Sequence, residues 1–293
     1  MPDEVITARA ANGAVRVTAA TTTALVREAQ ARHDLSPTAS AAVGRLLSGA
    51  VLLAASLKQG DRVSLQIAGS GPLGGIVADA AVLDRAIGGR AYAKVPTADL
   101  PLNSRGKFDV GGAIGSGTLH VTKSFSVGQP YVGIVPLVSG EIGDDIAAYL
   151  WDSEQIPSIV ALGVLANPDG IIAAGGVIAQ ILPGADERII TQLENHAQRM
   201  RSITSQMSAG ADAETLARNL AGDLDIDVSE RLAVEFKCRC SRQKVEIALL
   251  GLGREQLEQL AKEGEDTEAT CEYCKTRYYF APGEVVDLLA RAS

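Results

Sequence analysis

Cysteine is missing from residues 1–237 of this 293-residue chain. The four cysteines, Cys238, Cys240, Cys271 and Cys274, all fall near its end. In a reducing compartment, a Cys-x-Cys and a Cys-x-x-Cys separated by the segment 241–270 indicate a metal site before they indicate structural disulfides. The uneven distribution therefore predicts a metal site near the end of the chain, and zinc is the metal that suits it.

Long hydrophobic runs and a signal sequence are missing as well. The most apolar segment, Leu46 to Leu57, has twelve residues, whereas a membrane-spanning helix needs roughly 20. The chain starts with Met1-Pro2-Asp3-Glu4, which is acidic where a secretory signal is basic and then apolar. We therefore expect a cytoplasmic protein that has no membrane partner.

The chain also lacks an excess of positive charge. Its 27 lysines and arginines face 35 aspartates and glutamates, which gives a net charge of −8 and a pI near 5.0. This balance argues against a nucleic-acid partner. The content of 46% hydrophobic and 21% charged residues is ordinary for a globular protein, so disorder of the whole chain is excluded.

Motifs for nucleotide binding and catalysis are absent too. The glycines of Gly69–Gly74 follow the dinucleotide-binding spacing, but Pro72 and the strand-like residues after it favour a turn over a helix. Gly106-Lys107 is followed by Phe108 and lacks the upstream glycine of a phosphate loop, so no use of ATP is indicated. The three histidines, His33, His120 and His196, are far apart. Because these motifs are absent, we expect that the protein is not an enzyme.

Hydrophobic patterning divides the chain into three parts. An α+β core domain is expected over residues 1–178, an acidic helical linker over 179–231 and a small metal-binding domain over 232–293. The segment 178–230 holds 4 basic and 9 acidic side chains, so it carries −5 of the net −8.

The elements expected in the first two parts mix helices with short strands. Ser36 and Pro37 predict the start of a nearly all-apolar helix, which must be buried on most sides. Ser139 is expected to cap a helix through Ser153. Further helices are predicted over 22–33, 186–203 and 212–221, and strands over 63–68, 75–80, 91–95, 117–126, 159–166 and 171–179.

The last part, 232–293, is too small a domain to fold on apolar burial alone. We expect strands over 232–236 and 278–280, with helices over 241–250 and 254–262 and a final helix beginning near Pro282. Tetrahedral zinc at ~2.3 Å from four thiolates places the sulfurs roughly 3.8 Å apart, which two close cysteine pairs can provide. Structural zinc supplies ~10–16 kcal/mol of apparent folding free energy, so loss of the metal should unfold this domain.

Six cations lie within four residues of a cysteine: Lys237, Arg239, Arg242, Lys244, Lys275 and Arg277. They are expected to favour the thiolate form and, once metal leaves, attack on an oxidant. The spacing leaves two hypotheses open, a redox switch and a structural zinc ribbon that never releases its metal. A thioredoxin-like exchange site fits less well, because Cys271–Cys274 lies between short strands and does not open a helix.

Short motifs along nearly the whole chain complete the pattern: Leu35-Ser36-Pro37, Gly44-Arg45, Gly71-Pro72-Leu73-Gly74, Ser139-Gly140-Glu141-Ile142, Ser153-Glu154-Gln155, Gly175-Gly176 and Gln180-Ile181-Leu182-Pro183. With these motifs the chain resembles the bacterial family of redox-regulated heat-shock chaperones of thirty-three kilodaltons. Phe236–Ser241 and Cys271–Cys274 stand where that family carries its zinc ligands. The cysteine pattern is the most specific element of the resemblance.

The resemblance implies an ATP-independent holdase of the oxidative stress response. In the reduced, inactive state Cys238, Cys240, Cys271 and Cys274 would bind one Zn²⁺. Oxidation would join Cys238 to Cys240 and Cys271 to Cys274, release zinc and unfold the C-terminal zinc-binding redox-switch domain. The linker would then detach, and the activated homodimer would bind unfolding client proteins and prevent their aggregation.

Two other functions compete with this one. A constitutive zinc-ribbon adaptor that binds protein or nucleic acid is suggested by the basic residues around the cysteines, and salt-dependent binding to RNA or DNA would identify it. An enzyme carried by the first domain is suggested only by its size and its glycine-rich turns, and no catalytic residue can be named for it.

Overall fold

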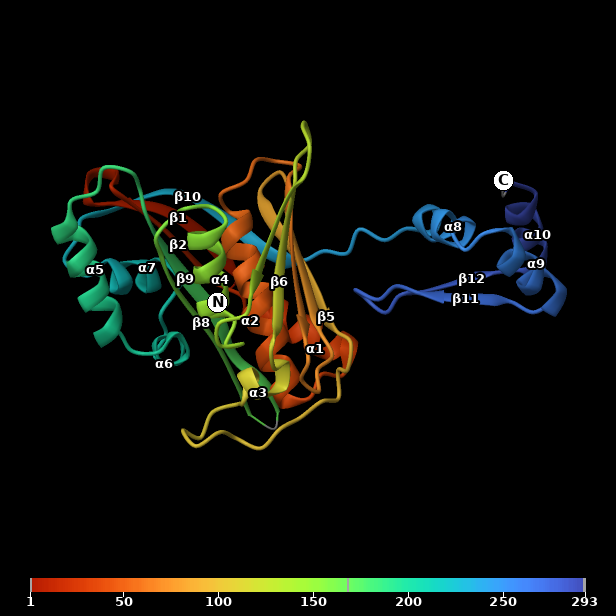
Figure 1. Cartoon of the computed structure of the whole chain (residues 1–293), viewed down its shortest axis with the longest axis horizontal. Coiled ribbons are helices and arrows are strands. Elements are labelled where there is room, and N and C mark those ends of the chain that lie inside the picture. The colour runs from red at the N-terminus through yellow and green to blue at the C-terminus, as the bar shows by residue number, and fades with distance from the viewer. Residues whose placement is uncertain (1, 168, 292–293) are drawn as a thin grey trace. The chain divides into compact units, whose positions relative to one another are not determined.

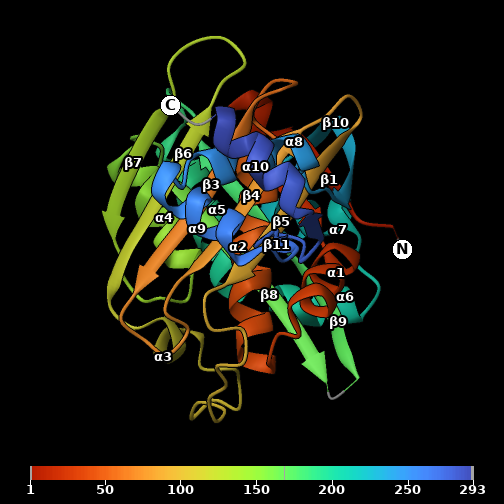
Figure 2. The same cartoon turned by 90° about the vertical axis from the view of Figure 1, so that its right-hand side faces the viewer.

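A ten-stranded sheet organises the chain up to Lys237 in the computed structural model, which describes residues 2–167 and 169–291 (Figure 1). The strand order is β7-β6-β3-β4-β5-β10-β1-β2-β9-β8, and part of it can be followed across Figure 2. The strands are β1 (Glu4–Ala10), β2 (Val15–Thr21), β3 (Arg62–Gly69), β4 (Ile76–Val82), β5 (Ala86–Ala93), β6 (Gly117–Ser124), β7 (Tyr131–Pro136), β8 (Ser158–Asn167), β9 (Gly170–Ile181) and β10 (Ile226–Phe236).

Strand β10 joins the two halves of this sheet. Residues Ala233–Phe236 pair in parallel with Ala86–Gly89 of β5. On its other side β10 runs antiparallel to β1, with a register shift between Thr7 and Ala8. All other neighbouring strands of the sheet are antiparallel. Without β10, the halves β7-β6-β3-β4-β5 and β1-β2-β9-β8 share no hydrogen-bonded strand pair.

The main hydrophobic core surrounds helix α2 (Pro37–Ala54), which lies between the two halves of the sheet (Figure 1). The Ser36 hydroxyl accepts a hydrogen bond from the Ala39 amide at 3.1 Å and caps the helix, as expected. By length and composition α2 could cross a membrane, but 89% of it is buried inside the protein, which is typical of a core helix. Helices α1 (Thr23–His33), α3 (Val110–Ile114) and α4 (Gly143–Asp152) pack around the same core.

A second apolar cluster covers the opposite face of β1, β2 and β9. Successive side chains of a strand point to opposite faces, so Ala20 belongs to the main core while Val17 and Ala19 belong to the second cluster. Three helices cover this face: α5 (Glu187–Arg199), α6 (Ile203–Ser208) and α7 (Ala213–Ala221). The helices expected over 186–203 and 212–221 are thus present, although the first ends at Arg199 and a new helix begins after Ser202.

The residues from Cys238 onward form a separate compact unit. Its core is small: Leu249, Leu257, Phe280, Val285 and Leu288 are its buried apolar cluster. They come from helices α8 (Arg242–Leu250), α9 (Arg254–Glu263) and α10 (Pro282–Arg291) and from the hairpin of β11 (Thr267–Thr270) and β12 (Arg277–Phe280). The helices expected in this region are confirmed.

The structure differs from the sequence-based expectations in several elements, among them the unexpected helix α3 and the strand expected over 91–95, which is β5 at Ala86–Ala93. The strand expected over 232–236 belongs to β10 of the large sheet, so the compact units meet at Lys237 and Cys238. The helix expected from Ser139 begins at Gly143, because the amides of residues 138–140 and 142 donate to the buried Asp145 carboxylate and hold a turn there. Strand β7 was not expected. The α+β fold class is confirmed, and the division at 178 and 231 stays a prediction.

Candidate metal centre

Two turns carry the four cysteines. Cys238 and Cys240 lie on the segment between β10 and α8, and Cys271 and Cys274 lie in the turn between β11 and β12. The second turn is closed by hydrogen bonds from the Lys275 amide to the Cys271 carbonyl at 2.8 Å and from the Cys271 amide to the Thr276 carbonyl at 2.9 Å. The second turn therefore presents Cys271 and Cys274 from a hydrogen-bonded backbone.

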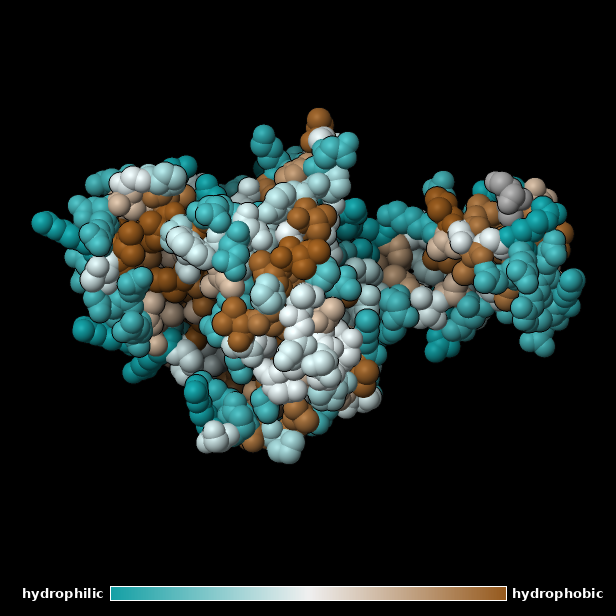
Figure 3. Space-filling view, viewed as in Figure 1, coloured by the Kyte–Doolittle hydropathy of each residue, from teal (hydrophilic) through white to brown (hydrophobic). Residues whose placement is uncertain are grey.

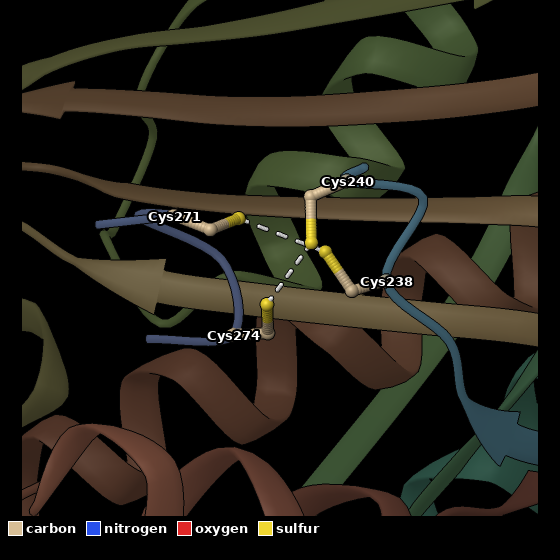
Figure 4. Close-up of side chains that lie close together, drawn as sticks. All are labelled: Cys238, Cys240, Cys271 and Cys274. Atoms are coloured by element: carbon tan, nitrogen blue, oxygen red, sulfur yellow. Dashed lines mark hydrogen bonds between the residues drawn. The ribbon is translucent and has the colours of Figure 1, made fainter. Parts of the chain in front are cut away.

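The four sulfurs point toward one another (Figure 4). The Sγ atoms of Cys238 and Cys271 are 3.7 Å apart, those of Cys240 and Cys274 are 3.4 Å apart, and all four lie within 4.8 Å of one another. The cysteines are free thiols. These separations are close to the roughly 3.8 Å edge of a four-thiolate zinc tetrahedron, so the residues fit a metal ion of this kind.

Burial around the cluster disfavours thiolate charge in the absence of a cation. Burial raises the pKa of Cys271 to about 12 and also raises the pKa of Cys240. The Tyr278 hydroxyl donates to Cys240 Sγ at 3.1 Å, which opposes the rise at Cys240 and raises the pKa of Tyr278 itself to about 12. For the four sulfurs to become thiolate ligands together, a cation must balance their negative charge, as a divalent metal does.

Four of the six basic residues near the cysteines have other partners in the structure, and the expectation that these cations favour thiolate stays a prediction. The Arg242 guanidinium pairs with Glu284 at 2.5 Å and lies 4.3 Å from the centre of the Phe280 ring. Lys275 pairs with Glu272 at 2.9 Å, Arg277 lies 3.6 Å from Glu268, and Lys244 donates to the Arg239 carbonyl at 2.6 Å. None of these cations is among the largest causes of the pKa shifts of Cys240 and Cys271.

The other sequence motifs lie outside the cysteine cluster. Gly71 lies in the turn after β3, where a Cβ atom would come 2.4 Å from the Ala113 carbonyl oxygen, so the glycine is required by close packing of the backbone. The histidines stay apart, with His33 on α1, His120 on β6 and His196 on α5. Across residues 2–167 and 169–291, the four cysteines are the one group of side chains placed to hold a metal ion.

Comparison with known proteins gives a full-length match. Residues 3–281 match the family model described as Hsp33 protein. The 33 kDa chaperonin of Bacillus velezensis is 42% identical, with 98% of each chain covered, and that of Nostoc punctiforme is 41% identical, with 99% of this chain and 97% of the relative covered. A crystal structure of the Thermotoga maritima 33 kDa chaperonin (heat shock protein 33 homolog) superposes with a TM-score of 0.90 at 35% identity, covering 99% of each chain.

These matches extend over the sheet, the helices and the cysteine-bearing turns alike, and they confirm the resemblance that the motifs indicated. The name that the relatives share is that of a chaperone. The chain therefore belongs to the Hsp33 family of 33 kDa chaperonins.

Proposed function

We propose that this protein is a cytoplasmic, ATP-independent holdase that is inactive while Cys238, Cys240, Cys271 and Cys274 bind one Zn²⁺. The observation that carries the proposal is the position of the four sulfurs, within 4.8 Å of one another in a unit whose core holds five buried apolar residues. A metal at this place would join the two turns and stabilise a fold that its own core supports weakly.

The chain's own groups prepare the reduced site. The hairpin of β11 and β12 fixes Cys271 and Cys274, and Ser241 caps α8 directly after Cys240 by accepting the Lys244 amide at 3.3 Å. Tyr278 donates to Cys240 Sγ, and the Cys274 thiol lies 3.2 Å from the Thr276 hydroxyl. Bound zinc would supply the positive charge that lets all four sulfurs be thiolates.

Oxidation would remove the link between the two turns. Each disulfide forms when two thiols lose two electrons and two protons, and one hydrogen peroxide is reduced to two waters, so two peroxides oxidise the four thiols. Sulfur contacts of 3.7 and 3.4 Å run from one turn to the other. Disulfides within each turn, Cys238 to Cys240 and Cys271 to Cys274, would leave neither metal nor covalent bond between the turns, so the unit would lose its support.

Loss of this unit would free apolar surface in the first unit. Leu193, Ile203 and Leu220 of the linker helices pack against the face of the sheet that carries Val17 and Val177. In the folded protein apolar side chains reach the visible surface only in separate patches (Figure 3). Detachment of α5–α7 would expose a continuous apolar face, the kind of surface that binds unfolding proteins. We propose that the activated protein is a homodimer.

The test measures light scattering of a thermally unfolding client protein in nucleotide-free buffer. The peroxide-treated, zinc-free protein should suppress aggregation, and the reduced zinc-bound protein should not. A variant with serine at all four cysteines separates metal loss from disulfide formation, because it loses zinc but cannot be oxidised at these positions. Equal suppression by the reduced and oxidised native chains would contradict redox control.

A further inference from the structure

Strand β10 occupies the interior of the sheet but is exposed like an edge strand. It has β5 on one side and β1 on the other. Yet Val234 is the one buried residue among its eleven, whereas every residue of β4 and six of the seven residues of β2 are buried. An interior strand normally holds its place through apolar burial on its faces. Strand β10 therefore buries less apolar surface than β2 or β4, and four of its five apolar contacts with the two cores are only partly buried.

Besides the apolar side chains that pack at the margins of the two cores, such as Leu232 and Phe236, β10 is held by backbone hydrogen bonds and surface ion pairs. The Val234 amide donates to the Asp3 carbonyl at 3.0 Å, and the Lys237 amide donates to the Gly89 carbonyl at 3.0 Å. Arg231 pairs with Glu4 at 2.6 Å and with Glu214 of α7 at 2.8 Å, at the surface. Water can replace the hydrogen bonds, and exposed ion pairs contribute little. The free energy that retains β10 is therefore small for an interior strand.

Both ends of β10 continue into segments that the proposed function releases. Helix α7 ends at Ala221, shortly before the strand begins at Ile226. At the other end, Lys237 alone separates Phe236 from Cys238 of the metal centre. Once α7 has detached and the metal-binding unit has unfolded, β10 is a strand with a free chain on either side. Local unfolding then extends to it readily.

The sheet would keep both of its halves without β10. Helix α2 packs on β3, β4 and β5 of one half and on β2, β8 and β9 of the other. The main core includes buried residues of both halves, such as Val63 and Ile178. Departure of β10 would therefore leave a slot between β5 and β1, with unpaired backbone amides and carbonyls along both sides. Such a double edge is a template for an added strand.

We propose that this slot, residues 4–10 of β1 facing residues 86–89 of β5, binds extended segments of unfolding client proteins, which pair as a strand in place of β10. The inference rests on the proposed function and adds to it the site and the conformation of the client. Pairing through the backbone does not depend on client sequence. Gly88 of β5 leaves space for a side chain of the pairing segment, because a Cβ atom on Gly88 would come 2.7 Å from the Cβ of Lys237.

Competition with a synthetic peptide tests the slot directly. A peptide that copies residues 226–237 should bind the oxidised full-length chain, should not bind the reduced zinc-bound chain, and should reduce client capture several-fold. The matched control carries N-methyl groups at Val234 and Lys237, whose amides donate to the two sides of the slot. It should bind at least about tenfold more weakly, because it keeps the side chains and loses two hydrogen bonds.

Hydrogen exchange of the full chain locates the segments. On oxidation, residues 226–236, 4–10 and 86–89 should lose protection, and added client should restore it in 4–10 and 86–89 but not in 226–236. Recovery of these segments on dimerisation without client would assign the slot to a second copy and overturn the proposal. Client capture with no recovery and no competition by the peptide would also overturn it while leaving the holdase function intact. Absence of client capture by the oxidised chain would refute both.

Discussion

The two compact units are stabilised in different ways. In the first, fully buried side chains such as Leu46, Leu47, Leu65 and Ile67 belong to one large core around α2. In the second, five apolar residues form the core, and four sulfurs within 4.8 Å of one another stand where a metal would join its two turns. The difference predicts that stability is independent of metal in the first unit and depends on it in the second, which is what the proposed redox control requires.

Metal removal should produce the largest difference in stability between the two units. Chelation of zinc from the reduced protein is expected to remove about 10–16 kcal/mol of apparent folding free energy from the second unit. Hydrogen exchange should then show residues 242–291 unprotected, while the strands around α2 stay protected. If the second unit kept its protection after complete zinc removal, which elemental analysis would verify, the proposed dependence on metal would be wrong.

Acidification should weaken zinc binding steeply. Metal binding must displace protons from thiols, and burial holds the pKa of Cys271 at about 12 and raises that of Cys240. Protons therefore compete better as the pH falls, and Kd should increase on the order of tenfold per pH unit for each displaced proton below about pH 8. Competition titrations with a zinc chelator measure the slope. A Kd independent of pH would exclude thiols as the principal ligands.

A matched pair of core substitutions compares packing in the two units. Leu47 and Leu257 are both 0% exposed, one in each unit. Leu47→Ala should lower the free energy of unfolding of the first unit by about 2–5 kcal/mol and leave zinc affinity unchanged. Leu257→Ala should instead weaken zinc binding, because folding of the second unit and metal binding are coupled. Denaturant titration and zinc competition distinguish the two; equal effects of both variants on zinc affinity would contradict the separation.

The smallest effect is expected at the surface of the second unit. Arg242→Lys keeps the charge but loses the stacking on Phe280 and the geometry of the contacts with Glu284 and the Tyr279 carbonyl. It should destabilise the second unit by about 0.5–1 kcal/mol. Arg218→Lys is the control in the first unit, where the exposed pair with Glu214 contributes less. Hydrogen exchange of the zinc-bound variants, measured at increasing temperature, would give the stability of each unit.

The sequence predicted the features that depend on near neighbours in the chain. Ser36 and Pro37 marked the start of α2, and the spacing of the cysteines indicated the four thiols that the structure brings within 4.8 Å of one another. The sheet to which residues 232–236 belong could not be predicted in this way, because their sequence pattern indicates a strand but not its neighbouring strands. The partners of Arg242 and Arg277 were missed for the same reason: Glu284 and Glu268 reach them only through the tertiary fold.

The late position of β10 in the chain has a consequence for synthesis on the ribosome. Nine of the ten strands have been made once residue 181 is added, yet the strand that connects the two halves of the sheet lies at 226–236. Until that segment leaves the exit tunnel, the two halves of the sheet are not joined, and β5 and β1 each have an edge without a partner strand. The closing step of folding thus awaits nearly the whole polypeptide, and it comes immediately before the first cysteine emerges.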